Sequence, residues 1–147
     1  MKNIVTLPGN LEIKKNYIMM ARLKKFDYRS YYRENNSLNP LIDRLATLFK
    51  DHGTDVKWIL EELTDPQSRG ITGSASRIKI RGDKVILEPS STMEENPEDY
   101  AIEIDRDILI RLATEWQDLV RREVPEIFIF YKDREYFVSD ALPEGVD

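Results

Sequence analysis

The sequence predicts an α+β fold: an antiparallel sheet of about five strands, an N-terminal group of two to three helices and one C-terminal amphipathic helix packed on the sheet. Three observations predict it. Residues 105–120 place apolar side chains at helical spacing. Residues 76–88 and 100–104 alternate apolar and polar side chains, which is the period of a strand. Residues 126–139 read as two strands joined by a short polar turn.

The N-terminal elements are predicted to be helices. Residues 11–32 contain no proline or glycine, and several of their side chains share one helical face: Tyr17, Met20, Ala21, Lys24, Tyr28 and Tyr31. Asn39 is expected to cap a second helix that has Pro40 at its first position and runs to about residue 49. Thr54 is expected to cap a third, short helix.

The following elements are a loop, strands, a helix and a hairpin. Residues 65–75 are rich in glycine and serine and are expected to be loop, as are residues 89–99. Asp105 is expected to cap the C-terminal helix with its carboxylate, and Pro125 ends that helix. Residues 126–131 are apolar on both pleat faces, which predicts an interior strand covered on both sides.

The length of 147 residues predicts one domain, 1–147, with a helical part at about 11–64 and a sheet-plus-helix part at about 76–139. The chain has no cysteine, which excludes disulfides and thiolate metal sites and is compatible with a reducing cytosol. No apolar run approaches the ~20 residues of a membrane span, and the first residues do not read as a signal peptide. We therefore expect a cytoplasmic location and no membrane partner.

Charge is unevenly distributed along the chain. Residues 1–63 carry 11 bases and 8 acids, residues 64–82 carry 4 and 1, and residues 83–147 carry 7 and 18. An acidic surface repels phosphates, so the C-terminal half is disfavoured as a nucleic-acid binder and favoured as a binder of a basic protein. The candidate partner-binding residues come from the acidic segment 88–107: Glu94, Glu95, Glu98, Asp99 and Asp107, with Tyr100 as an aromatic anchor. The alternative is that these acids belong to a solvated loop and a helix start.

Two rival functions remain open. The basic segment 22–33 interleaves aromatics with bases, as nucleic-acid-binding surfaces do, although packing on a helix face explains those aromatics more simply. A carboxylate-metal hydrolase is a less favoured alternative, since the sequence has no calcium-loop pattern and its single histidine, His52, has no partner at a suitable spacing. We therefore expect no enzymatic activity, catalytic residue, metal or cofactor.

One segment resembles a known class of proteins. Residues 102–116, Ile-Glu-Ile-Asp-Arg-Asp-Ile-Leu-Ile-Arg-Leu-Ala-Thr-Glu-Trp, followed by Ile-Phe-Ile-Phe-Tyr at 127–131, resemble the closing strand–helix–hairpin unit of small bacterial immunity proteins. These proteins accompany polymorphic and contact-dependent growth inhibition toxins. The resemblance implies a cytosolic, non-enzymatic inhibitor that binds one cognate toxin domain. A nuclease toxin would have a basic substrate site, which an acidic surface can cover.

Overall fold

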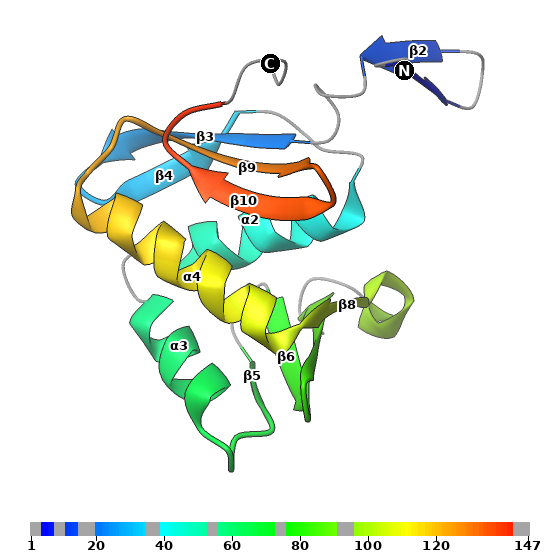
Figure 1. The fold of residues 1–147 in the computed structure, drawn as a ribbon, viewed down its shortest axis with the longest axis vertical. Coiled ribbons are helices and arrows are strands. Elements are labelled where there is room, and N and C mark those ends of the chain that lie inside the picture. The colour runs from blue at the N-terminus through cyan, green and yellow to red at the C-terminus, as the bar shows by residue number, and fades with distance from the viewer. Residues whose placement is uncertain are drawn as a thin grey trace.

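A computed structural model describes residues 4–7, 11–14, 20–34, 39–52, 56–72, 76–90 and 96–142. In these residues the chain forms two four-stranded antiparallel sheets, a separate two-stranded hairpin and three α-helices (Figure 1). The helices are α2 (Pro40–His52), α3 (Val56–Thr64) and α4 (Arg106–Arg121). The predicted α+β class is confirmed, but the prediction of a single sheet of about five strands is wrong.

The first sheet has the strand order β10-β9-β3-β4. Its strands are β3 (Met20–Asp27), β4 (Ser30–Arg33), β9 (Glu126–Lys132) and β10 (Glu135–Ser139). The predicted C-terminal hairpin is confirmed as β9–β10, and β9 pairs antiparallel with β3, where Leu23 lies opposite Ile127. The hairpin therefore joins the N-terminal segment and not the strands that precede α4.

The helix predicted over residues 11–32 is wrong for residues 11–14 and 20–32, and residues 15–19, with Tyr17, lie outside the described residues. The structure has β2 (Leu11–Lys14), which pairs with β1 (Ile4–Leu7), and then the β3–β4 hairpin. Along β3, Ala21 and Leu23 are fully buried, whereas Arg22 and Lys24 between and after them are only partly buried. This alternation is the period of a strand. The segment forms a strand instead of the predicted helix because it can pair with β9.

The second sheet has the order β5-β6-β7-β8. Its strands are β5 (Gly70–Thr72), β6 (Ser76–Arg81), β7 (Lys84–Pro89) and β8 (Ile102–Asp105). The predicted β6–β7 hairpin is confirmed, whereas β5 lies inside the segment predicted to be loop. Tyr100 ends a short 3-10 helix, η2 (Pro97–Tyr100), so the strand predicted to start there starts at Ile102.

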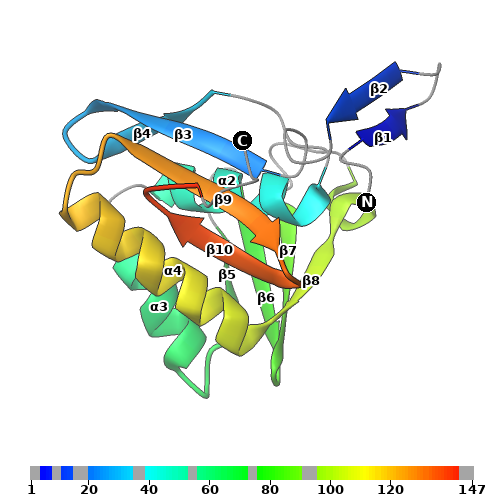
Figure 2. The same cartoon turned by 45° about the horizontal axis from the view of Figure 1, so that its top comes forward.

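The core lies between the two sheets and includes all three helices. Helix α2 contacts β3, β4 and β9 of the first sheet and β6, β7 and β8 of the second, and α4 packs along α3 and β10 (Figure 2). Trp116 of α4 is fully buried, with its ring stacked on Phe49 at 5.4 Å and meeting the edge of Tyr31 at 5.7 Å. Aromatic contacts of this kind stabilise the fold beyond the contribution of the apolar area that the rings bury.

The predicted caps have different outcomes. The Asn39 side-chain oxygen accepts hydrogen bonds from the backbone N–H groups of Leu41 (3.0 Å) and Ile42 (3.1 Å), so the cap of α2 is confirmed. Asp105 occupies the N-cap position of α4 with extended backbone angles, but its carboxylate makes no capping hydrogen bond; it bonds Lys84 instead. Thr54 lies outside the described residues.

The prediction of an interior strand covered on both faces is confirmed by β9. Ile127 and Ile129 join the main core, whereas Phe128 and Phe130 form a second apolar cluster with Met20 on the opposite face of the sheet. None of these four β9 side chains is more than 5% exposed. Within the part of the chain that the structure describes, no helix is long and apolar enough to cross a membrane.

Candidate binding surface

Three of the predicted contact residues lie together on η2. Glu98 and Asp99 are exposed in its first turn, and the Tyr100 ring is 54% exposed at its end. The 3-10 helix packs against β7 and leads through Ala101 into β8. Its carboxylates and its aromatic ring are therefore presented to solvent from a fixed position beside the second sheet.

The remaining predicted contact residues do not lie on η2. Glu94 and Glu95 lie outside the described residues. Asp107 is exposed in the first turn of α4, at the other end of β8 from η2. Two further exposed acids occupy β8 between them. We call the whole set the β8 acidic ridge: Glu98, Asp99, Glu103, Asp105 and Asp107.

Glu103 and Asp105 lie in the acidic segment 88–107 but are not among the contact residues predicted from the sequence. The alternation along β8 could have identified them, because it leaves Ile104 buried between the two exposed acids.

Two bases lie beside the ridge. The Lys84 ammonium bonds the Asp105 carboxylate, and this hydrogen bond together with the charge of Asp105 raises the pKa of Lys84. The Arg106 guanidinium points to backbone carbonyls and donates to Leu63 (2.6 Å), Gly82 (3.0 Å) and Asp65 (3.1 Å). Arg106 therefore ties α4 to the end of α3 and to the β6–β7 turn, and carboxylates outnumber bases along the ridge.

One acid of the predicted acidic segment has a different role. Glu88 is only 1% exposed and pairs with Arg77 and, at 3.2 Å, with Lys79 of the neighbouring strand β6. A buried charge needs such partners. Glu88 is therefore a structural residue of the second sheet and not part of the exposed ridge.

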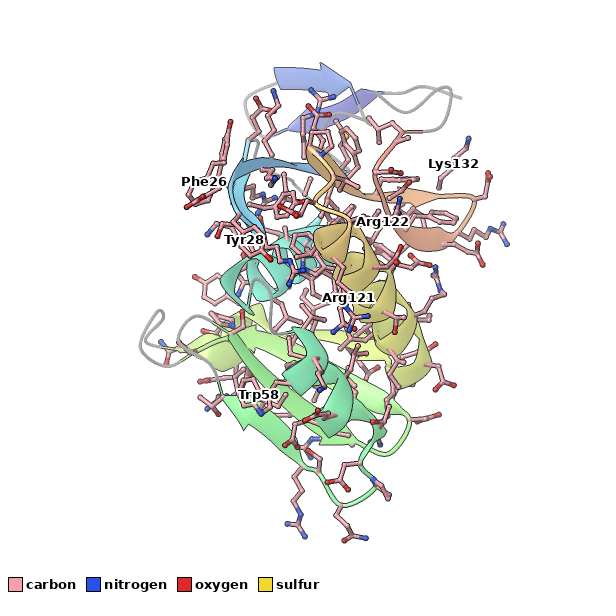
Figure 3. All side chains as sticks on the ribbon, turned by 90° about the vertical axis from the view of Figure 1, so that its left-hand side faces the viewer. Phe26, Tyr28, Trp58, Arg121, Arg122 and Lys132 are labelled. Carbon is pink, nitrogen blue, oxygen red and sulfur yellow. The ribbon has the colours of Figure 1, made fainter. Side chains whose placement is uncertain are left out.

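A second exposed surface is the β3–β4 aromatic tip, which consists of Phe26, Tyr28 and Tyr32. Their side chains are 65%, 63% and 42% exposed. The ring of Phe26 meets the edge of Tyr32 at 6.0 Å, and the Arg29 guanidinium lies over the Tyr28 ring at 5.0 Å. Figure 3 shows Phe26 and Tyr28 at the same end of the molecule as Arg121 and Arg122 of α4. Among the tyrosines of this hairpin, core packing accounts only for Tyr31, which is 5% exposed.

The bases near the aromatic tip are largely paired with acids. Lys24 lies 3.0 Å from Glu34 and 3.7 Å from Glu126. Lys25 lies 3.3 Å from Glu123, and Arg33 pairs with Asp43. These pairs reduce the positive potential that a phosphate backbone would meet at the tip.

The rival metal-site hypothesis has a direct geometric test. Among the described residues, no group of three or more histidine, aspartate or glutamate side chains lies close enough together to hold a metal ion. His52 is the last residue of α2.

Comparisons with protein-family models, with curated proteins and with solved structures find no match to this chain.

Proposed function

We propose that this protein is an immunity-type inhibitor that binds a cognate bacterial toxin domain and covers the toxin's basic substrate site with the β8 acidic ridge. The single observation that carries the proposal is the line of exposed carboxylates along β8 and both of its flanks. The action is non-covalent and takes place in the cytoplasm of the protected cell.

The charge of the ridge suits a nuclease toxin in particular. A site that binds a phosphate backbone must be basic, and complementary charge steers two proteins together and raises their association rate. Tyr100, exposed beside Glu98 and Asp99, offers the aromatic anchor that such interfaces use at their centre.

The test is a charge-reversal series measured against the cognate toxin domain, which is to be sought in the neighbouring upstream reading frame. Glu98→Lys with Asp99→Lys should lower the association rate by about tenfold or more at low salt and flatten its salt dependence. Glu94→Lys and Glu95→Lys complete the series.

The matched control is Glu61→Lys with Asp118→Lys, which makes the same change in net charge on side chains that are 64% and 66% exposed on α3 and α4. The control should bind nearly as the native protein does. Equal association rates and salt slopes for the ridge variant and the native protein would reject the ridge as the interface.

The second candidate function is nucleic-acid binding through the β3–β4 aromatic tip. The exposure of Phe26, Tyr28 and Tyr32 favours it, because exposed rings can stack on unpaired bases. A gel-shift titration with single-stranded RNA and DNA at low salt tests it. Retention that is lost in Phe26→Ala with Tyr28→Ala would support this candidate over the inhibitor.

A further inference from the structure

A pocket of about 300 Å³ opens beside β8, at the middle of the acidic ridge. Its apolar floor comes from four separate elements: Leu41 of α2, Ile104 of β8, Ile108 of α4 and Tyr136 of β10. Leu41 and Ile104 are 9% and 6% exposed, so both are anchored in the core while they reach the pocket. The Tyr136 ring is supported by the Tyr131 ring, whose centre lies 4.7 Å away.

The rim of this pocket is acidic. Glu103 and Asp105 line it together with Lys84, and the Lys84 ammonium already bonds Asp105. The Arg111 guanidinium, next to the floor on α4, donates to the Tyr136 carbonyl at 2.7 Å and to Glu115 at 3.2 Å. Each of these bases therefore has an acid or a carbonyl group as an acceptor. The Glu103 carboxylate forms no hydrogen bond or ion pair among the described residues, and its charge contributes, after that of Asp105, to the raised pKa of Lys84.

The backbone of β8 has a strand on one side only among the described residues. β8 is an edge strand of its sheet, paired only with β7 within the described residues. The Arg106 N–H donates to the Asp83 carbonyl at 2.8 Å, so Arg106 and Asp83 form a hydrogen-bonded pair. Ile104 lies opposite Val85, two positions along the ladder from that pair. Because hydrogen-bonded and non-bonded pairs alternate along an antiparallel ladder, the N–H and C=O of Glu103 point away from β7.

We infer that this pocket receives an arginine side chain from an extended segment of the partner protein, which pairs with the open edge of β8. The inference rests on the proposed function and names the element of the toxin that the ridge recognises. The aliphatic stem of the arginine would cover Ile104 and Ile108. The guanidinium would bond the Glu103 carboxylate and lie near the Tyr136 ring, while the peptide backbone would pair with the free groups of Glu103.

The probe is a short extended peptide, acetyl-Val-Arg-Val-amide, compared with the same peptide carrying citrulline, the neutral isostere of arginine. Both are titrated into the full chain to about 10 mM, which saturates a site with a Kd near 1 mM. The readout is the set of backbone amide signals in two-dimensional NMR. We expect saturable shifts of the amide signals of Glu103, Ile104 and Asp105. The citrulline peptide should bind with about tenfold lower affinity than the arginine peptide.

A matched pair of variants locates the contact. Glu103→Gln should weaken arginine-peptide binding by about tenfold, because it removes the charge at the pocket rim. Glu98→Gln removes the same charge from the ridge outside the pocket and should change the affinity little. Equal affinity for the two peptides, or no saturable shift at β8, overturns the inference.

The two proposals fail separately. If the arginine peptide does not bind but the Glu98 and Asp99 reversal still slows toxin association, the pocket inference is wrong and the inhibitor function stands. If the peptide saturates the pocket but the toxin does not bind, the inhibitor function is wrong. A second copy of this chain is the other occupant of an open edge. Concentration-dependent mass in sedimentation, with the same β8 amide shifts in the absence of peptide, would overturn the inference in favour of self-association.

Discussion

Glu88 lies directly opposite Arg77 across the β6–β7 ladder, and the two side chains form an ion pair in which the carboxylate is almost completely buried. Lys79, two residues along β6, adds a second cation at 3.2 Å. In sequence, Glu88 is indistinguishable from the exposed acids that follow it. In the fold it is the buried partner of two bases on the neighbouring strand.

Replacing Glu88 with glutamine tests this structural role. Glu88→Gln keeps the shape of the side chain but removes the charge that Arg77 and Lys79 face, so we expect the free energy of unfolding to fall by about 1–3 kcal/mol. Arg77 is 28% exposed and can regain some hydration, which keeps the loss below that of a fully buried pair. Urea unfolding measures the change. Glu103→Gln on the exposed edge is the control, and an equal, small effect of both variants would contradict the assignment.

The hydroxyl of Tyr31 connects β4 to the loop after α4. It donates a hydrogen bond to the Val124 carbonyl at 2.5 Å, and both residues are buried. Tyr31→Phe leaves that carbonyl without its donor, so we expect a loss of about 1 kcal/mol at neutral pH. Chemical unfolding of the two proteins at one temperature measures it, and an unchanged midpoint would argue against a contribution from this bond.

The same residue predicts a pH dependence. Burial, and then the charge of Glu123, raises the pKa of Tyr31 above its ordinary value of 10.0. The unfolded chain therefore loses this proton at a lower pH than the folded chain. The contribution of the protonated Tyr31 hydroxyl to the free energy of unfolding is complete below pH 10.0. It is lost as the pH rises through the folded-state pKa. Tyr31→Phe should flatten this alkaline decline in a series of unfolding curves, whereas parallel declines in the two proteins would contradict the prediction.

Two glycines with positive φ form a matched pair for testing the sheet. Gly70 in β5 has φ 140°, and a Cβ atom there would overlap the carbonyl oxygen of Ile78. Gly82 in the β6–β7 turn has φ 62° and open space around it. Gly70→Ala should cost about 3 kcal/mol or more, and Gly82→Ala about 1–2 kcal/mol. Thermal unfolding compares them, and the reverse order would show that β5 does not pair with β6 as described.

The β3–β4 aromatic tip should contribute little to stability. Phe26→Ser and Tyr28→Ser remove side chains that are mainly in solvent, so each should change the free energy of unfolding by less than about 0.5–1 kcal/mol. Toxin binding through the ridge should be unaffected in the same variants. A large fall in Tm would instead mean that the tip is packed, and a loss of toxin affinity would move the interface to this end of the molecule.

The sequence by itself determined the elements whose signals are local. Helices α2, α3 and α4 and the hairpins β6–β7 and β9–β10 follow from periodicity, from the cap at Asn39 and from turn residues, all of which act within a few positions. The interior position of β9 was also determined, because a run that is apolar on both pleat faces has to be covered on both.

Only the tertiary structure decided the conformation of residues 20–33 and the division into two sheets. In a helix, Tyr28 and Tyr31 would share one face. Ala21 and Leu23 gain more burial when β3 pairs with β9, which is about a hundred positions away in the chain. The same holds for the site. The pocket beside β8 takes its floor from α2, β8, α4 and β10, and no local pattern records that these four segments meet. The physical reason is that pairing and burial are properties of distant segments brought together, whereas periodicity and capping belong to one segment at a time.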